Sequence, residues 1–205
     1  EEVLKLFHSG HAVECFGGLR EFHLLEHLFP EAAVALDGNE TGLNFLQLAM
    51  QSTDERIHKN MPVTPAFLFA ALLWAPLLKR TEKRLAKGEP HALALQKSAS
   101  AMIGEQIRHV SIPKRFTMVM RDIWALQSRF SYRRGKRADS VFEHPKFGAA
   151  YDFLCLRSKA GEISDGDCRC WTEFQENSPE VQKKQTESQP RRRPRRRKRS
   201  NKPKD

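Results

Sequence analysis

The chain has 205 residues, of which 40% are apolar and 29% are charged, and its formal net charge at pH 7 is +10. This length and composition allow one sizeable hydrophobic core. The most apolar stretch, residues 66–78, is interrupted by Pro76 and is shorter than the run of about 18 apolar residues that a bilayer requires, so we expect no membrane span. The chain begins EEVLKLF, which is acidic, already helical in pattern and without an initiator Met. We therefore expect no signal peptide and interpret the chain as the C-terminal part of a longer protein.

Helical periodicity extends along nearly the whole chain, whereas strand alternation never lasts more than a few residues. The sequence therefore predicts an all-α, irregular helical body of about eight or nine helices. In chain order, helices are expected at Glu2–Phe7, Ala12–Phe16, Leu19–Leu28, Gly42–Met50, Pro65–Leu78, Ala92–Arg108, Lys114–Phe130, Pro145–Ser158 and Cys168–Gln175. Turn-forming segments separate them, and Pro65 and Pro145 suit the first turn of a helix, where a missing N–H costs nothing.

The predicted body ends near Glu176. The segment NSPEVQKKQTESQ that follows has almost no large apolar side chains, so burial cannot offset its chain entropy. We divide the chain into helices of residues 1–30, a helical body of residues 31–176 and a disordered, arginine-rich tail of residues 177–205.

Four cysteines, Cys15, Cys155, Cys168 and Cys170, are too few and too irregularly spaced for a disulfide framework, which favours a reducing cytoplasm. The pair Cys168 and Cys170 resembles half of a metal site, but no second cysteine pair or HxxxH follows. We expect an ordinary pair of loop thiols and no metal.

Positive charge is concentrated in two segments. Residues 190–205 carry +9, and residues 113–137 carry eight Lys or Arg against Asp122, whereas the rest of residues 1–189 sums to −6. A polyanion is the natural partner for such a distribution.

On a helical wheel, the helix expected at Lys114–Phe130 has an apolar arc at about 20° to 140° and a cationic arc at about 240° to 360°. The apolar arc holds Phe116, Val119, Met120, Ile123, Leu126 and Phe130, and the cationic arc holds Lys114, Arg115, Arg121 and Arg129. If the helix continues past Phe130, Arg133 and Lys136 extend the cationic arc, with Arg134 and Arg137 nearby. The alternative is the solvated face of an ordinary amphipathic helix. Because one sign of charge dominates, we favour nucleic-acid contact, for which the arginine fork is suited.

Trp124 and Tyr132 are candidates for stacking on bases, although Trp124 lies beside the apolar arc and is expected in the core. The tail is either a nonspecific polycation or targeting signal, or an arm that adds RNA affinity without specificity. Three prolines in it disfavour a regular helix. Its candidate RNA-binding residues are Arg191, Arg192, Arg193, Arg195, Arg196, Arg197, Lys198 and Arg199.

Three fragments resemble pieces of active sites. Gly17 and Gly18 lack the Lys-Ser/Thr of a phosphate loop, and we expect them to form a turn between two helices. Asp165 and Asp167 have the spacing of a two-metal site but no strand to aim them, and an Asp in such a break commonly caps the next helix.

The third fragment consists of His8, His11 and His58, which lack the adjacent His-Asp pair of a metal phosphohydrolase, so structural histidines are expected. A metal hydrolase remains the weakest alternative. We find no complete active site in these residues and assign no catalytic residue. Whether the chain alone is an enzyme therefore stays open, and a binding module is the interpretation that fits best.

Four stretches, EEVLKLFHSGHAVECFGGLREFHLLEHLFP, DERIHKNMPVTPAFLFAALLWAPLL, SIPKRFTMVMRDIWALQSRFSYRRGKRA and EHPKFGAAYDFLCLRS, resemble the body of bacterial poly(A) polymerases, which are class II nucleotidyltransferases. Their order and the arginine-rich end extend the resemblance over essentially the whole chain. A CCA-adding tRNA nucleotidyltransferase is the nearest alternative, disfavoured by the arginine tail, and a non-catalytic helical adaptor is another.

The resemblance implies an enzyme that adds AMP from ATP to RNA 3′ ends and thereby marks RNA for decay. It implies that the catalytic groups, with Mg²⁺ and ATP, belong to an N-terminal head ahead of Glu1, and that this chain holds no cofactor of its own. It implies that residues 1–30 are neck and body helices in which the RNA-binding region starts. The implied partners are single-stranded RNA 3′ ends, the missing head and RNA-decay proteins, in the cytoplasm.

Overall fold

The computed structural model describes residues 2–177, and over this range the chain is helical, with no strand. The predicted all-α fold is therefore confirmed. The chain divides into two units, Glu1–Trp171 and Thr172–Asp205, and the packing described below belongs to the first. The predicted tail, apart from its first residue, lies outside the described residues.

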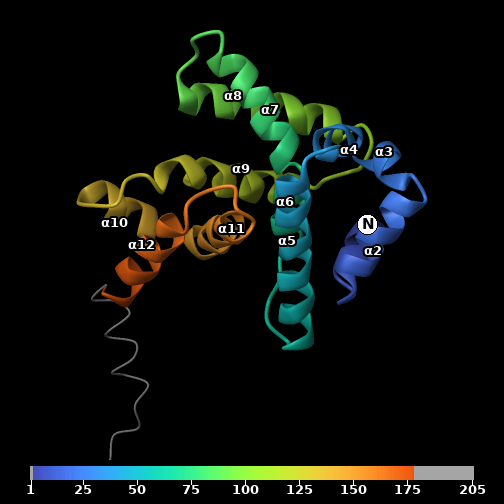
Figure 1. The fold of residues 1–205 in the computed structure, drawn as a ribbon, viewed down its shortest axis with the longest axis horizontal. Coiled ribbons are helices and arrows are strands. Elements are labelled where there is room, and N and C mark those ends of the chain that lie inside the picture. Colours follow the sequence, from blue (N-terminus) through green and yellow to red (C-terminus); the bar gives the residue numbers. More distant parts are fainter. Residues whose placement is uncertain (1, 178–205) are drawn as a thin grey trace, which may run out of the picture. The chain divides into compact units, whose positions relative to one another are not determined.

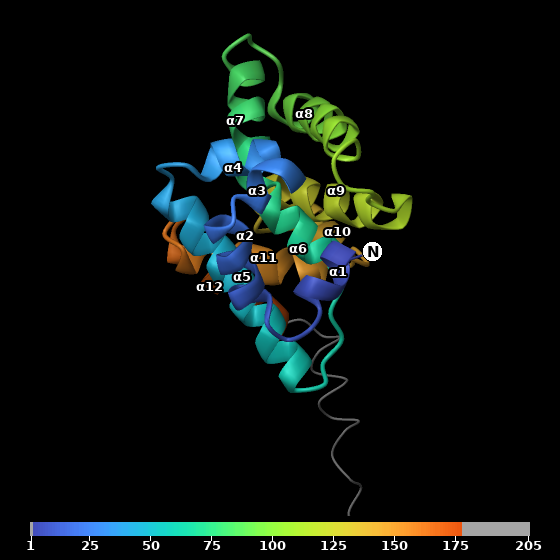
Figure 2. The same ribbon diagram turned by 90° about the vertical axis from the view of Figure 1, so that its right-hand side faces the viewer.

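The described residues form twelve helices, where eight or nine were expected (Figure 1). They are α1 (Glu2–Phe7), α2 (Ala12–Glu21), α3 (Leu24–Leu28), α4 (Pro30–Leu36), α5 (Glu40–His58), α6 (Pro65–Leu72), α7 (Trp74–Leu85), α8 (His91–Gln106), α9 (Lys114–Arg129), α10 (Lys136–Phe142), α11 (Phe147–Lys159) and α12 (Asp165–Glu176). α7 and α8 lie side by side in both views (Figures 1 and 2). No helix among residues 2–177 combines the length and the apolar character needed to cross a bilayer.

Prolines explain two of the differences from the expected helices. Pro30, taken as part of a break, is the first residue of α4, where its fixed φ suits the first turn. The expected helix Pro65–Leu78 is two helices, because α6 ends at Leu72 and α7 begins at Trp74. This break places Pro76 in the first turn of α7, where its missing N–H leaves no helical hydrogen bond unmade. Pro145, in contrast, precedes α11 and is not in its first turn.

The beginning of α2 is capped by a side chain from another helix. Asp54 of α5 accepts hydrogen bonds from the backbone N–H groups of Ala12 (2.7 Å) and Val13 (3.1 Å). His11, at the N-cap position, makes no such bond with its own side chain. A carboxylate at the N-terminus of a helix accepts hydrogen bonds from N–H groups that have no partner within the helix. Its negative charge also interacts favourably with the helix dipole. α2 is therefore fixed to α5 by the cap.

A largely buried ion pair connects α7 to the end of α11 and the turn that follows it. Glu162 accepts hydrogen bonds from Arg157 Nε (2.9 Å) and from Trp74 Nε1 (2.9 Å). The Arg157 guanidinium also lies 4.7 Å from the centroid of the Trp74 ring. The side chains of Arg157 and Glu162 are only 12% and 18% exposed, so this pair is much less screened by water than a surface pair.

A second charged group joins α4, α7 and α8. Arg80 donates to Glu31 through Nε (2.6 Å) and also binds Glu105 through Nη2. Burial raises the pKa of Glu31, and the hydrogen bond from Glu31, followed by that from Arg80, lowers the pKa of Glu105. Arg80 therefore holds two carboxylates of different acidity together at the junction of three helices.

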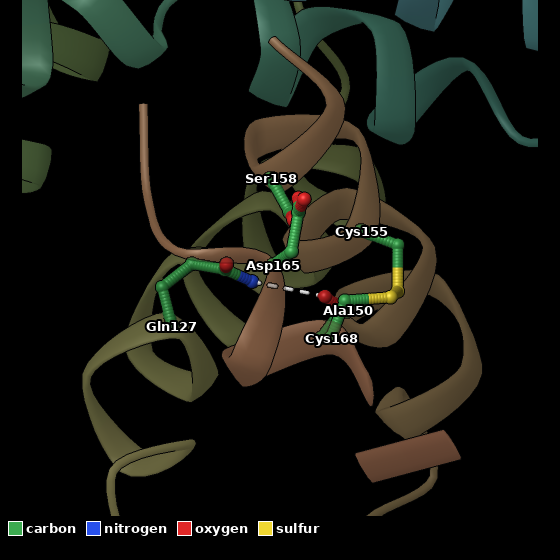
Figure 3. The surroundings of a disulfide bond; sticks show 6 residues. All are labelled: Gln127, Ala150, Cys155, Ser158, Asp165 and Cys168. Atoms are coloured by element: carbon green, nitrogen blue, oxygen red, sulfur yellow. Dashed lines mark hydrogen bonds between the residues drawn. A yellow bond between two sulfur atoms is a disulfide. The ribbon is translucent and has the colours of Figure 1, made fainter. Parts of the chain in front are cut away.

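The pairing of the cysteines differs from the expectation. Cys168 is not a loop thiol but lies on α12 and forms a disulfide with Cys155 of α11 (Figure 3). Close to this bond, Ser158 donates to Asp165 Oδ1 at 2.7 Å. The interpretation as a pair of loop thiols fails because the polar stretch before Cys168 turns back and begins a helix at Asp165, next to α11. Cys170 is a free thiol.

Candidate nucleic-acid interface

The basic helix expected from the sequence exists as α9, which ends one residue earlier than expected. Most of its apolar arc is buried, with Met120 and Ile123 fully covered, while Phe116 and Val119 are partly buried. Trp124 is 1% exposed, and its Nε1 donates to the Ala70 carbonyl of α6 at 3.1 Å. Trp124 is therefore a core residue, as predicted, and is not available for stacking on a base.

The first turn of α9 carries two exposed cations, Lys114 and Arg115. The Arg115 guanidinium lies 4.9 Å from the centroid of the Phe116 ring. Cations at a helix N-terminus oppose the macrodipole, which favours acids there by roughly 0.3–1 kcal/mol each. Helix stability therefore does not explain this charge, whereas an anionic ligand at the same place would be favoured.

Farther along α9, Arg121 and Arg129 are half-buried. Arg121 Nη1 donates to Ser100 Oγ of α8 at 2.7 Å, and Arg129 Nη2 donates to Ser140 Oγ of α10 at 3.1 Å. Among the residues that the structure describes, neither guanidinium forms an ion pair. Each is oriented by a neutral hydroxyl, so its charge stays uncompensated and its other donors remain for a ligand.

α9 does not continue past Phe130, because the helix ends at Arg129 and a new helix begins at Lys136 (Figure 1). Gly135 has a φ of 67°, which L side chains rarely adopt, and it permits the turn between the two helices. This turn and the start of α10 expose Arg133, Arg134, Lys136 and Arg137. We call these four residues, together with Lys114, Arg115, Arg121 and Arg129, the basic surface.

Two residues of the basic surface have local partners. Arg133 pairs with Asp167 of α12, and the Arg137 guanidinium lies 5.1 Å from the centroid of the Tyr132 ring. Tyr132 is 42% exposed, so part of its ring remains accessible for stacking. The predicted tail residues, from Arg191 to Arg199, lie outside the described range.

The other candidate fragments have structural roles. Gly17 and Gly18 lie inside α2 and do not form the expected turn between two helices. The helix break comes later, at His23, whose φ is 56°. Asp165 and Asp167 lie in the first turn of α12. Asp165 accepts a hydrogen bond from Ser158, and Asp167 pairs with Arg133.

The three candidate histidines, His8, His11 and His58, lie at the end of α1, the start of α2 and the end of α5. The rings of His11 and His58 meet edge to face with centroids 6.2 Å apart. His8 is half-buried, its Nε2 has no hydrogen-bond partner, and burial lowers the pKa of its imidazole. Within residues 2–177, no three His, Cys, Asp or Glu side chains come together as metal ligands would.

Sequence reasoning missed a groove of about 570 Å³ beside α2, α3 and α4. Its lining residues are Arg20, Glu21, His23, Leu25, Glu26, Ala33, Val34, Leu36, Asp37 and Leu43. The expected single helix Leu19–Leu28 concealed it, because the groove depends on the left-handed residue His23 that separates α2 from α3. Histidine is enriched at positive φ, but only a few per cent of non-glycine residues adopt it, so a single histidine does not by itself mark a helix break.

Over the described residues, the chain is all-α and gathers eight cations on the basic surface. Residues 87–204 match the family model described as "Polymerase A arginine-rich C-terminus", and residues 1–36 match the one described as "Probable RNA and SrmB- binding site of polymerase A". The chain therefore belongs to the bacterial poly(A) polymerase family. All sixteen predicted cationic site residues fall within the arginine-rich match.

Several relatives agree with this assignment. The chain is 40% identical over 188 residues to "Poly(A) polymerase I" of Escherichia coli O157:H7, an alignment that covers 89% of this chain and 40% of that protein. It is also 40% identical over 192 residues to the enzyme of the same name from Salmonella typhimurium, and 33% identical over 202 residues to that of Haemophilus influenzae. The chain spans about two fifths of the length of these curated relatives.

Proposed function

We propose that this chain binds single-stranded RNA through the basic surface, with the arginines of residues 191–199 as an additional arm. The observation that carries the proposal is the charge of +7 on residues 113–137, most of it on α9 and in the turn that follows. The rest of residues 1–189 is net acidic, so the basic surface is the part of the body to which a phosphate backbone would be attracted.

The geometry supports phosphate contact more than base reading. From Lys114 to Arg129, α9 spans about 22 Å at 1.5 Å per residue, so its cations can follow several phosphates of one strand. Arg121 and Arg129 are held by serine hydroxyls, and an oriented guanidinium loses less side-chain entropy when it binds. Tyr132 is the aromatic side chain of this region with exposed ring surface for an unpaired base.

We further propose that the complete protein adds AMP from ATP to RNA 3′ ends, with Mg²⁺, in the cytoplasm, and that the products are directed to RNA-decay proteins. Family membership and the names of the relatives support this activity. No catalytic residue is assigned in this chain, whose part is to hold the RNA. The test is incubation of the complete protein with RNA, Mg²⁺ and each nucleotide in turn. Extension with ATP alone is expected, and a product ending in CCA, or no use of ATP, would contradict the proposal.

RNA binding itself is tested by Arg121→Ala combined with Arg129→Ala, measured by fluorescence anisotropy with an A-rich RNA. The two substitutions should weaken binding several-fold and make the slope of log affinity against log salt shallower by about 1.4, at roughly 0.7 for each phosphate neutralised. Lys83→Ala combined with Lys87→Ala is the matched control, because it removes the same charge from exposed positions of α7 and the loop after it. Equal effects of the two pairs would mean that only net charge matters and would refute a specific basic surface.

A further inference from the structure

The disulfide between Cys155 and Cys168 is a feature that the proposed function does not use. It joins α11 to the first turn of α12, and both cysteines are half-buried, so neither residue is sealed from solvent (Figure 3). In a cytoplasm, thiol reductants keep cysteines reduced, and the disulfides that do form there are mostly catalytic or redox-sensing. A disulfide in a chain that works in that compartment, as proposed above, therefore indicates a reversible bond.

The beginning of α12 depends strongly on this bond, because the helix buries little. Trp171 is the one buried side chain of α12, and the Trp171 Nε1 donates to the Phe130 carbonyl oxygen at 2.9 Å. Ordering each residue of a helix costs conformational entropy, which the burial of one tryptophan offsets for only a few residues. The disulfide reduces this cost, since it keeps α12 close to α11 even when the helix opens. Without the bond, we expect residues 165–171 to open locally.

The same part of α12 carries an acid that neutralises a cation of the basic surface. Asp167, the residue before Cys168, pairs with Arg133 in the turn between α9 and α10. Arg121 and Arg129, in contrast, are oriented by neutral serine hydroxyls. Within the described residues, Arg133 is therefore the member of the basic surface whose charge an acid of α12 compensates.

We propose that Cys155 and Cys168 form a reversible oxidation site that reacts with low-molecular-weight thiols and their disulfides, and that its state sets how many cations the basic surface offers to RNA. In the oxidised state, α12 is held beside α11 and Asp167 pairs with Arg133. In the reduced state, residues 165–171 open, and the Arg133 guanidinium becomes available to a phosphate. The effect on RNA rests on the function proposed above.

The exchange balances in two steps. The thiolate of one small thiol attacks a sulfur of the disulfide, forms a mixed disulfide with that cysteine and releases the other cysteine as a thiolate, which takes up a proton. A second small thiol then attacks the mixed disulfide and frees the remaining cysteine. The protein gains two electrons and two protons, and two small thiols become one small disulfide, so an excess of the small disulfide drives the reverse reaction.

The first test follows the bond and α12 in the complete protein, equilibrated with defined ratios of reduced and oxidised glutathione. Alkylation and mass spectrometry should show Cys155 and Cys168 passing together from free thiols to a disulfide at ratios found in cells. Hydrogen exchange of residues 165–171 should be faster in the reduced protein, whereas that of α9 should be unchanged. Cys155→Ser should exchange like the reduced protein at every ratio. Cys170→Ser is the matched control, because it removes a free thiol of α12 and should behave like the wild type.

The second test measures affinity for an A-rich RNA in both states by fluorescence anisotropy. One further phosphate contact steepens the slope of log affinity against log salt by about 0.7, which between 1 M and 0.1 M salt amounts to about fivefold tighter binding by the reduced protein. Asp167→Asn should give the oxidised protein the same higher affinity and remove the dependence on redox state. Asp139→Asn is the matched control, because it removes an equal charge from an exposed position of α10 and should leave the redox difference intact.

A bond that stays formed at every glutathione ratio, or never forms, would overturn the proposal, as would equal hydrogen exchange of residues 165–171 in the two states. Equal RNA affinity of the oxidised and reduced proteins would overturn the role of Arg133. If the protein binds RNA in neither state, the proposed RNA function fails, whereas the glutathione titration and the hydrogen exchange still decide whether the cysteines form a reversible oxidation site.

Discussion

Replacing Glu162 by Ala should destabilise the chain far more than removal of an ordinary surface carboxylate. The substitution leaves the Arg157 guanidinium, 12% exposed, without its counter-ion, and leaves Trp74 Nε1 without its acceptor. Removing one partner of a buried pair costs about 3–5 kcal/mol. Because the pair retains slight exposure, we expect the lower end, about 3 kcal/mol, which for a chain of this size lowers the melting temperature by about 6–12 °C.

The assay is urea denaturation followed by circular dichroism, with Glu55→Ala as the control. Glu55 pairs with Lys59 on the surface of α5, where the two side chains are 69% and 66% exposed, and its loss should cost less than about 0.5 kcal/mol. The double variant Arg157→Met with Glu162→Ala should recover part of the loss, since no unpaired charge then remains. A cost below about 1 kcal/mol for Glu162→Ala would refute the view that this network stabilises the junction of α7 and α11.

Three further predictions concern stability. Gly17→Ala should stabilise the chain by about 0.5–1 kcal/mol in a thermal melt, because a Cβ at this helical position meets no atom within 4 Å; destabilisation would contradict the helical placement. His8 has a lowered pKa in the folded state, so the unfolded state binds its proton more readily and stability is lost as pH falls below the ordinary value of 6.5. Urea titrations at pH 7.5 and 5.5 should show a larger loss for the wild-type chain than for His8→Gln, and equal losses would refute the assignment. Cys155→Ser should cost about 3 kcal/mol, as expected for a bond that closes a loop of this length, whereas Cys170→Ser should have no effect on the same denaturation curve.

Helices whose local sequence carries a clear signal, such as apolar residues at helical spacing or a proline at the first position, were predictable. α9 could be recognised because its apolar side chains recur at helical spacing and its cations share one sign, and the same wheel placed Trp124 in the core. Pro65 marked the start of α6 in the same way. At these positions, local propensity and tertiary packing favour the same conformation.

The rest depended on contacts between segments that are distant in sequence. The break at Leu73 falls within residues 66–78, a stretch without a polar side chain, so periodicity alone gives one helix there. The cap of α2 comes from Asp54, more than 40 residues away. Cys155 and Cys168 meet only because α12 folds back beside α11, and spacing does not reveal such a pairing. The candidate cations were easy to find, but their hydroxyl partners, Ser100 and Ser140, lie on other helices.

The most direct test of RNA binding by the basic surface is a salt series with A-rich single-stranded RNA and two chains, residues 1–205 and residues 1–188. The account predicts that the shorter chain still binds, with a slope of log affinity against log salt that is shallower by about 0.7 for each phosphate the tail neutralises. It also predicts that Arg121→Ala, Arg129→Ala and Arg133→Ala together remove most of the remaining affinity. If truncation alone abolishes binding, the tail is the only part of this chain that holds RNA, and the basic surface does not bind it.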